Sequence, residues 1–255
     1  MIMLQLYSYT ILSVIIVSLL SFVGVLTIFI KKRKVNDFLL FLMSLSAGSL
    51  FGDAFIHLLP EAVKENGFTL LVSLSVLGGV LLFFILEKFV HMHHHDIPSA
   101  QKSTHHHAYH LGVMNLFGDA VHNFIDGLII AGSFIVSVPV GIATTIAVIF
   151  HEIPQEIGDF GVLLYSGMSV KKALWFNFLS ALVAIAGAVV GLMIGKSSTT
   201  FVQILLPFAV GGFLYIAGSN LIPELHKECG WKESLLHFGA MVLGIVIMVG
   251  LLFLG

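Results

Sequence analysis

The chain has 255 residues, of which 58% are hydrophobic and 10% are charged, and its mean hydropathy is +1.03. A soluble domain carries about 25% charged residues, so this composition excludes a soluble globular protein and predicts a polytopic membrane protein. The net charge of −2 gives no sign of nucleic-acid binding, and the single cysteine excludes an intrachain disulfide framework.

Eight apolar stretches are each close to the roughly 20 residues that a helix needs to cross a bilayer. They cover 11–30, 38–60, 68–87, 111–135, 139–165, 173–195, 201–223 and 235–254. Their continuous apolar character excludes a β-barrel, whose strands alternate in polarity. The first stretch is long, no basic residue precedes it, and Lys31-Lys32-Arg33-Lys34 follows it, so we interpret it as a transmembrane helix and not as a signal peptide.

The distribution of basic residues predicts the orientation. Ten of the 12 lie between helices 1 and 2, 3 and 4, 5 and 6, or 7 and 8: Lys31, Lys32, Arg33, Lys34, Lys88, Lys102, Lys171, Lys172, Lys227 and Lys232. Only Lys64 and Lys196 lie in the other connections. The positive-inside rule therefore places the four basic connections in the cytoplasm and both termini outside, in a plasma membrane or a bacterial inner membrane.

The second helix carries Asp53 and His57 one turn apart on a shared face. One explanation is a structural contact that locks two helices together. Because ionisable groups inside a membrane are costly and two further spans also carry them, we favour a role in lining a pathway.

A polar stretch at 88–110 separates the third and fourth helices and is rich in histidine. It contains His91, His93, His94, His95, His105, His106, His107 and His110. Neutral imidazoles in such tracts bind late transition metals weakly. We expect a mobile cytoplasmic loop that gathers or senses metal and is separate from the intramembrane site; a solvated linker is the alternative.

The fourth and fifth helices carry the strongest signal. His122, Asn123 and Asp126 of the fourth align without a gap with His151, Glu152 and Gln155 of the fifth, 29 residues later. Each helix thus offers an imidazole, an adjacent oxygen ligand and another oxygen ligand one turn on. Two such stripes facing each other would surround one or two divalent cations, as facing helices do in metal-binding bundles.

Further carboxylates follow on the fifth helix, at Glu156 and Asp159. Each charged group near the bilayer centre costs about 2.5–3.5 kcal/mol on insertion scales, so these carboxylates need a function. Pro154 removes the backbone donor that would reach residue 150 and frees or bends the helix beside them. A polar, kinked intramembrane helix is a candidate site.

Imidazole and carboxylate ligands without a thiolate favour zinc, Fe(II) or Mn(II) over Mg²⁺, Ca²⁺ or Cu(I). His151-Glu152-x-x-Gln155 also lies one residue from the His-Glu-x-x-His motif of zinc metalloproteases. Here the second imidazole is missing and Pro154 interrupts the motif, so we expect no enzyme and no organic cofactor. A metal sensor or channel would use the same ligands, and both stay open.

The second and seventh helices resemble each other. At an offset of 163 residues, His57-Leu58-Leu59-Pro60-Glu61 lies against Asn220-Leu221-Ile222-Pro223-Glu224. The predicted topology makes these helices run in opposite directions, which indicates an inverted repeat of the kind found in alternating-access transporters. In the sixth helix, Gly187, Gly191 and Gly195 suit close helix packing.

Together these motifs resemble the ZIP (Zrt/Irt-like protein) family of divalent-metal transporters over nearly the whole chain. The segment 122–127 is similar to that family's helix-4 signature, and 151–160 and 52–61 are similar to helices 5 and 2 of the branch reading His-Glu-x-Pro-His-Glu. The resemblance implies zinc uptake into the cytoplasm, with Fe(II), Mn(II) and Cd(II) as alternative substrates. It also implies an eight-helix 3+2+3 arrangement with inverted repeats around helices 4 and 5, and a homodimer.

By the same resemblance, His122, Asp126, His151 and Gln155 would shape one metal site, and Asn123 and Glu152 would lie toward a neighbouring one. Helix 2 would add His57 and Asp53. Gln155 departs from the family, where histidine is common, and Glu156 is a candidate to compensate. The expected organisation is helices 1–3 at 1–87, the histidine-rich loop at 88–110, helices 4–5 with the metal site at 111–165, and helices 6–8 at 166–255.

Overall fold

The computed structural model describes residues 2–29, 32–64, 67–95, 104–226 and 230–254. Within these residues the chain is almost entirely helical and contains no strand. Eight stretches of the described chain are long and apolar enough to cross a membrane: Gln5–Leu26, Phe38–Val63, Leu70–Lys88, Asn115–Val136, Val138–Leu164, Val170–Gly195, Thr200–Leu221 and Trp231–Leu251. The predicted all-α membrane fold with eight spans is confirmed.

Several spans are built from more than one helical segment. The first contains α1 (Ile2–Leu19) and the 3₁₀ segment η1 (Leu20–Phe29), and the second contains α2 (Lys32–Gly52), the π-helical η2 (Asp53–Leu58) and α3 (Leu59–Val63). The third to fifth are α4 (Leu70–His95), α5 (Thr104–Val136) and α6 (Val138–Tyr165). The last three contain α7 (Val170–Ala181) and α8 (Val183–Ser197); α9 (Thr199–Tyr215), the π-helical η3 (Ile216–Leu221) and α10 (Ile222–Leu225); and α11 (Trp231–Leu251) with the 3₁₀ segment η4 (Leu252–Leu254).

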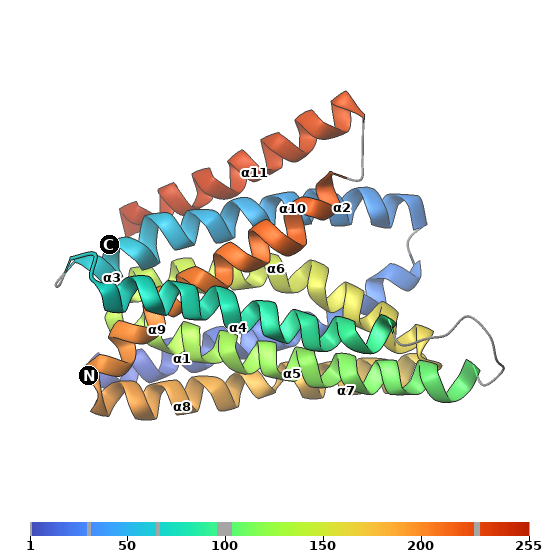
Figure 1. The fold of residues 1–255 in the computed structure, drawn as a ribbon, viewed down its shortest axis with the longest axis horizontal. Helices are drawn as coiled ribbons and strands as arrows, with labels where there is room; N and C mark the ends of the chain where they lie inside the picture. The colour runs from blue at the N-terminus through green and yellow to red at the C-terminus, as the bar shows by residue number, and fades with distance from the viewer. Residues whose placement is uncertain (1, 30–31, 65–66, 96–103, 227–229, 255) are drawn as a thin grey trace.

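The helices form an elongated bundle in which the start of α1 and the end of α11 lie at the same end (Figure 1). Close backbone contact joins α5 to α8. A Cβ atom added at Gly127 would lie 1.9 Å from the carbonyl oxygen of Ala184, and one added at Gly187 would lie 2.0 Å from that of Phe124. No larger residue fits at either position without moving a helix, which confirms the close packing predicted for Gly187.

The two π-helical segments lie at matching places in the second and seventh spans. Segment η2 covers 53–58 and η3 covers 216–221, so they are separated by the same 163 residues as the sequence repeat. Each precedes a proline, Pro60 or Pro223, whose ring disturbs the preceding turn. Figure 1 shows α2 and α9 running in opposite directions. These features support the inverted repeat, while the 3+2+3 grouping stays a prediction.

The helices on either side of the histidine-rich stretch extend further than expected. Helix α4 continues to His95 and α5 begins at Thr104, so the backbone is helical at both ends of the predicted 88–110 loop. The first strong helix breaker after Lys88 is Pro98, and no glycine or proline precedes it to end α4 earlier. The side chains of the eight histidines in this stretch lie outside the described residues.

Candidate metal centre

The packed helices α5 and α6 bring four potential metal ligands together inside the membrane-spanning part of the chain. They are His122 and Asp126 of α5 and His151 and Glu152 of α6, and one donor atom from each lies within 4.8 Å of the others. Asp126, His151 and Glu152 are fully or almost fully buried, and His122 is partly buried. We call these four residues the four-ligand centre.

The spacing of the four donor atoms fits a tetrahedral cation. His122 Nε2 lies 3.3 Å from Glu152 Oε1 and 3.6 Å from Asp126 Oδ2. His151 Nε2 lies 3.1 Å from Asp126 Oδ2, 3.5 Å from Glu152 Oε1 and 3.4 Å from His122 Nε2. Ligands at about 2.0–2.1 Å from a tetrahedral Zn²⁺ are separated from one another by about 3.3 Å. The centre therefore matches zinc coordination in ligand type and in these five donor–donor distances, while the sixth, between Asp126 and Glu152, is within 4.8 Å.

A backbone contact sets the orientation of one imidazole. His151 Nδ1 lies 3.1 Å from the carbonyl oxygen of Ala147, one turn earlier on α6. A carbonyl only accepts, so Nδ1 carries the proton in this contact and Nε2 presents its lone pair to the centre. The aromatic rings of Phe83 and Phe213 pack against His122 and His151, with centroids 5.7 Å and 6.0 Å away, and limit the orientations of both imidazoles.

The carboxylates of the centre lack other partners. Within the described part of the chain, both oxygens of Glu152 and Oδ1 of Asp126 are buried and accept no hydrogen bond. A buried carboxylate without compensation is strongly destabilising, whereas a bound cation satisfies it. The arrangement is therefore suited to holding a cation and is costly without one.

Pro154 affects the backbone beside the centre as the sequence predicts. The carbonyl of Phe150, which would accept from residue 154 in a regular helix, instead accepts a hydrogen bond from the hydroxyl of Ser46 on α2. A second helix thus supplies the missing donor. Pro154 predicts that the carbonyl of Phe150 loses its helical donor, but no sequence pattern identifies Ser46 as the replacement donor.

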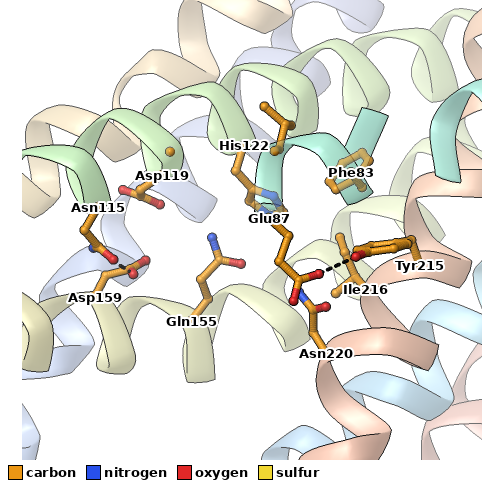
Figure 2. Close-up of a pocket in the computed structure, with 12 residues that line it drawn as sticks. Phe83, Glu87, Asn115, Asp119, His122, Gln155, Asp159, Tyr215, Ile216 and Asn220 are labelled. Carbon is orange, nitrogen blue, oxygen red and sulfur yellow. Dashed lines mark hydrogen bonds between the residues drawn. The ribbon is translucent and has the colours of Figure 1, made fainter. Parts of the chain in front are cut away.

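A cavity of about 250 Å³ reaches the centre at His122. Figure 2 shows its polar wall, with Asn115, Asp119, Gln155 and Asp159 on one side of His122 and Glu87, Tyr215 and Asn220 on the other. Tyr215 donates a hydrogen bond to Glu87 across α9 and α4. Asn115 begins the fourth span and Asp159 is near the end of the fifth, so this wall faces the 3–4 and 5–6 connections.

The other residues predicted on the fifth helix point to different surroundings. Gln155 lines the cavity together with His122 of the four-ligand centre. Glu156 is buried and accepts a hydrogen bond from Asn177 of α7, and Asp159 accepts one from Asn115 of α5 at 2.9 Å. The structure therefore directs these three side chains to the cavity, to α7 and to α5.

Asn123 is also buried, and its side-chain nitrogen donates to Asp119 Oδ1 at 2.9 Å. Its side-chain oxygen has no hydrogen-bond partner within the described residues. Asn123 follows His122 directly in the chain and thus brings an amide oxygen without a hydrogen-bond partner to this part of α5.

The pair predicted on the second span lies apart from the four-ligand centre. His57 Nδ1 is 3.3 Å from Asp53 Oδ1, and both side chains are buried. Asp53 Oδ2 accepts a hydrogen bond from the hydroxyl of Thr144 at 2.9 Å. Thr144 precedes His151 by two helical turns on α6, so the pair lies toward the opposite end of the bundle from the cavity wall at Asp159.

Sequence reasoning missed several polar partners: Ser46, Asn115, Thr144 and Asn177. Each is a small or neutral polar residue within an apolar span, and such residues are common in membrane helices as packing contacts. Their signal in the sequence is weak because nothing in the local pattern indicates which carboxylate or carbonyl they meet.

Comparison with known proteins gives consistent matches. A family model described as ZIP Zinc transporter matches residues 4–112 and 108–252. Zinc transporter ZIP13 of Pongo abelii is 36% identical over 224 residues, which cover 82% of this chain and 65% of that protein. Metal cation symporter ZIP14 of Xenopus tropicalis is 31% identical over 293 residues, covering 88% and 62%. The chain thus spans less than two thirds of the length of either relative. Zinc transporter YKE4 of Saccharomyces cerevisiae is 29% identical, and the match covers 86% of this chain and 71% of that protein.

Proposed function

This chain belongs to the ZIP zinc transporter family, and from that premise we propose that it carries divalent transition-metal cations, with zinc as the preferred substrate, across the membrane it spans. The observation that carries the proposal is the set of four donor atoms inside the spans. Five of the six pairs of these atoms are 3.1–3.6 Å apart. Two imidazoles and two carboxylates at this spacing suit zinc, and no catalytic role is needed to explain them.

The cavity and the charges support uptake as the direction of transport. The cavity reaches His122 from the side of the 3–4 and 5–6 connections, which the positive-inside rule places in the cytoplasm. We infer uptake, with release through this cavity. Alternating access then requires a second arrangement in which the cavity closes and a path opens on the other side, past Asp53 and His57.

The ligand assignment places one cation between His122, Asp126, His151 and Glu152. A neighbouring position is supplied by Glu152 Oε2 and Asn123 Oδ1, since both atoms are buried without a hydrogen-bond partner in the described residues. Gln155 lies beside the centre in the cavity and offers a neutral oxygen to a departing ion. Fe(II), Mn(II) and Cd(II) are the alternative substrates, because imidazole and carboxylate ligands accept them as well.

The assembly and location remain those implied by the resemblance and the charge distribution. We propose a homodimer in a plasma membrane or bacterial inner membrane, with both termini outside and the histidine tract (His91, His93–His95, His105–His107) as an accessory, cytoplasmic metal-gathering segment. Phe176, Trp175 and other large apolar side chains on the outer surface of the bundle are exposed, as expected for a surface in contact with lipid.

The test is zinc influx into proteoliposomes that contain a trapped zinc-sensitive dye. We expect influx with the natural chain, competition by Fe(II), Mn(II) and Cd(II), and loss of influx with Glu152→Ala. Glu61→Ala is the matched control, because Glu61 is a partly exposed carboxylate paired with Lys64 at 3.3 Å. Zinc binding by folded protein without influx would support a metal sensor in place of a transporter.

A further inference from the structure

We propose a second cation site on the cavity wall, distinct from the four-ligand centre and built from oxygen atoms of Asp119, Gln155 and Asp159. This proposal deepens the transport function proposed above and rests on it for the role of the site in release. The site lies between the centre and the 3–4 and 5–6 connections, where a departing cation would meet it.

Two amide side chains hold the carboxylates in the same way. Asn123 Nδ2 donates to Asp119 Oδ1 at 2.9 Å, and Asn115 Nδ2 donates to Asp159 Oδ1 at 2.9 Å. In both carboxylates the other oxygen, Oδ2, is buried and makes no hydrogen bond of regular geometry in the described chain, and the side chains of Ser180 and Gln155 lie close to Asp119. Each amide therefore fixes one oxygen and leaves the second available, as outer-shell partners do for metal ligands.

The free oxygens belong to one cavity. Asp119 is only 5% exposed, yet it lines the 250 Å³ cavity together with Asp159 and Gln155. Figure 2 shows these three side chains and Asn115 grouped on the same side of His122. The group draws on both α5 and α6, so its members are held by two packed helices and not by a loop.

Among the described residues that line the cavity, His122 of the four-ligand centre is the one basic side chain beside these carboxylates. Of the described residues that line the cavity, none is lysine or arginine. In the described chain, a lysine pairs with a carboxylate at Lys64 and Glu61, which lie at the connection between the second and third spans. Asp119 is buried and Asp159 is partly buried, and two carboxylates without a fixed positive partner inside a span are costly, so a mobile cation is the natural occupant.

The ligand type separates this site from the four-ligand centre. Asp119, Gln155 and Asp159 offer only oxygen, which suits harder cations such as Mn²⁺ and holds zinc less well than imidazole does. A zinc ion leaving His122 and His151 would therefore pass to a weaker site nearer the exit. Binding that is strong enough to accept an ion and weak enough to release it is what multi-site permeation requires.

The experiment uses Mn²⁺ as the probe and the full chain in lipid nanodiscs. Free Mn²⁺ gives a six-line electron paramagnetic resonance signal that is lost on binding, so bound equivalents can be counted. In a His122→Ala/His151→Ala background, we expect one equivalent that disappears on adding Asp119→Asn and Asp159→Asn. Glu61→Gln in the same background removes one carboxylate charge elsewhere and should leave that equivalent in place.

Two results would overturn the site: no Mn²⁺ equivalent in the His122→Ala/His151→Ala chain, as a proton-only role would give, or an equivalent that persists after both aspartates are replaced. If the quadruple variant does not fold, single substitutions in the otherwise natural chain, with one Zn²⁺ already bound, give the answer. Each of Asp119→Asn and Asp159→Asn should raise the Mn²⁺ Kd at least about tenfold, because losing an outer-shell partner alone costs about 10- to 100-fold. An unchanged Kd for both would reject the proposal.

The read-out is binding, so it separates this site from the transport proposal. Failure of zinc influx with the Mn²⁺ equivalent intact would remove the transport function and leave the site as a binding site. Influx with no such equivalent would leave transport standing and remove the site.

Discussion

The pair His122–Asp126 on α5 and the pair Asp53–His57 in η2 show how one spacing leads to two different environments. Both place a histidine and an aspartate one turn apart, inside a span and largely buried. Opposite the first pair, α6 contributes His151 and Glu152. Opposite the second pair, the same helix contributes the hydroxyl of Thr144.

The difference shows that a one-turn histidine and carboxylate pair is only half of a metal centre. Helix α6 contacts both pairs through positions two turns apart, and the side chain at each position decides what forms there. Where α6 supplies an imidazole and a carboxylate, four donors converge. Where it supplies a hydroxyl, one oxygen of Asp53 accepts a hydrogen bond, and the other oxygen, Oδ1, lies 3.3 Å from His57 Nδ1.

The largest expected effect comes from removing the contribution of α6 to the four-ligand centre. His151→Ala or Glu152→Ala should weaken zinc binding more than about 100-fold, since loss of an outer-shell partner alone costs about 10- to 100-fold. Isothermal titration of the purified protein measures this. His226→Ala, which removes an exposed imidazole just after α10, is the control. Equal zinc affinity in all variants would show that His151 and Glu152 do not bind zinc.

A smaller effect is expected from adding an imidazole beside the centre. Gln155→His replaces an amide oxygen with a ligand that zinc prefers over Mn²⁺. We expect the preference for zinc over Mn²⁺ to rise about tenfold, the equivalent of about 1.4 kcal/mol, and release to slow. Competition titrations and influx rates would show both changes, with Gln155→Asn as the amide control. A lower preference for zinc would contradict the role given to this position.

The other pair should respond through stability. Thr144→Val removes the donor to Asp53 Oδ2 and leaves a buried carboxylate oxygen unsatisfied, at a cost of about 1–3 kcal/mol. A lower thermal midpoint with zinc affinity at the centre within about twofold is the expected outcome. Thr144→Ser keeps the hydroxyl and should behave as the natural chain does. A zinc affinity that falls with Thr144→Val would show that the two regions act as one site.

The smallest effect is expected from the histidine tract. Replacing His91, His93, His94, His95, His105, His106 and His107 with asparagine should leave zinc influx at saturating zinc within about twofold, because weak imidazole tracts gather metal and do not form the intramembrane centre. Apparent affinity or regulation should change instead. Complete loss of influx would show that the tract is part of the transport path.

The spans and the clustering of candidate ligands from helices 4 and 5 could be predicted because their signals are local. Runs of about 20 apolar residues define the helices, and one-turn spacing identifies His122 with Asp126. Helical periodicity alone puts His151 and Glu152 on different faces of α6, since neighbouring residues on a helix point about 100° apart. They meet at one centre because that centre lies between α5 and α6, where both side chains can reach it.

What the sequence could not predict are contacts between helices that lie far apart in the chain. The roles of Asn115 and Asn177 depend on which helix packs against α6, and no local pattern determines that choice. The π-helical segments were equally hidden, since Pro60 and Pro223 predict a disturbed turn but not its form. The identity of the side chains predicts which kinds of ligand are present, and the packing of the helices determines which of these side chains come together.

The most direct test of the four-ligand centre is X-ray absorption at the zinc edge, on protein loaded with one equivalent of zinc. The variant without the histidine tract is the sample, so that imidazole scattering reports on the centre. We predict that the zinc ion has four nitrogen or oxygen neighbours at about 2.0 Å. Two of them are imidazoles, which are lost in His122→Ala/His151→Ala. A six-coordinate, all-oxygen environment that is unchanged by those substitutions would contradict it.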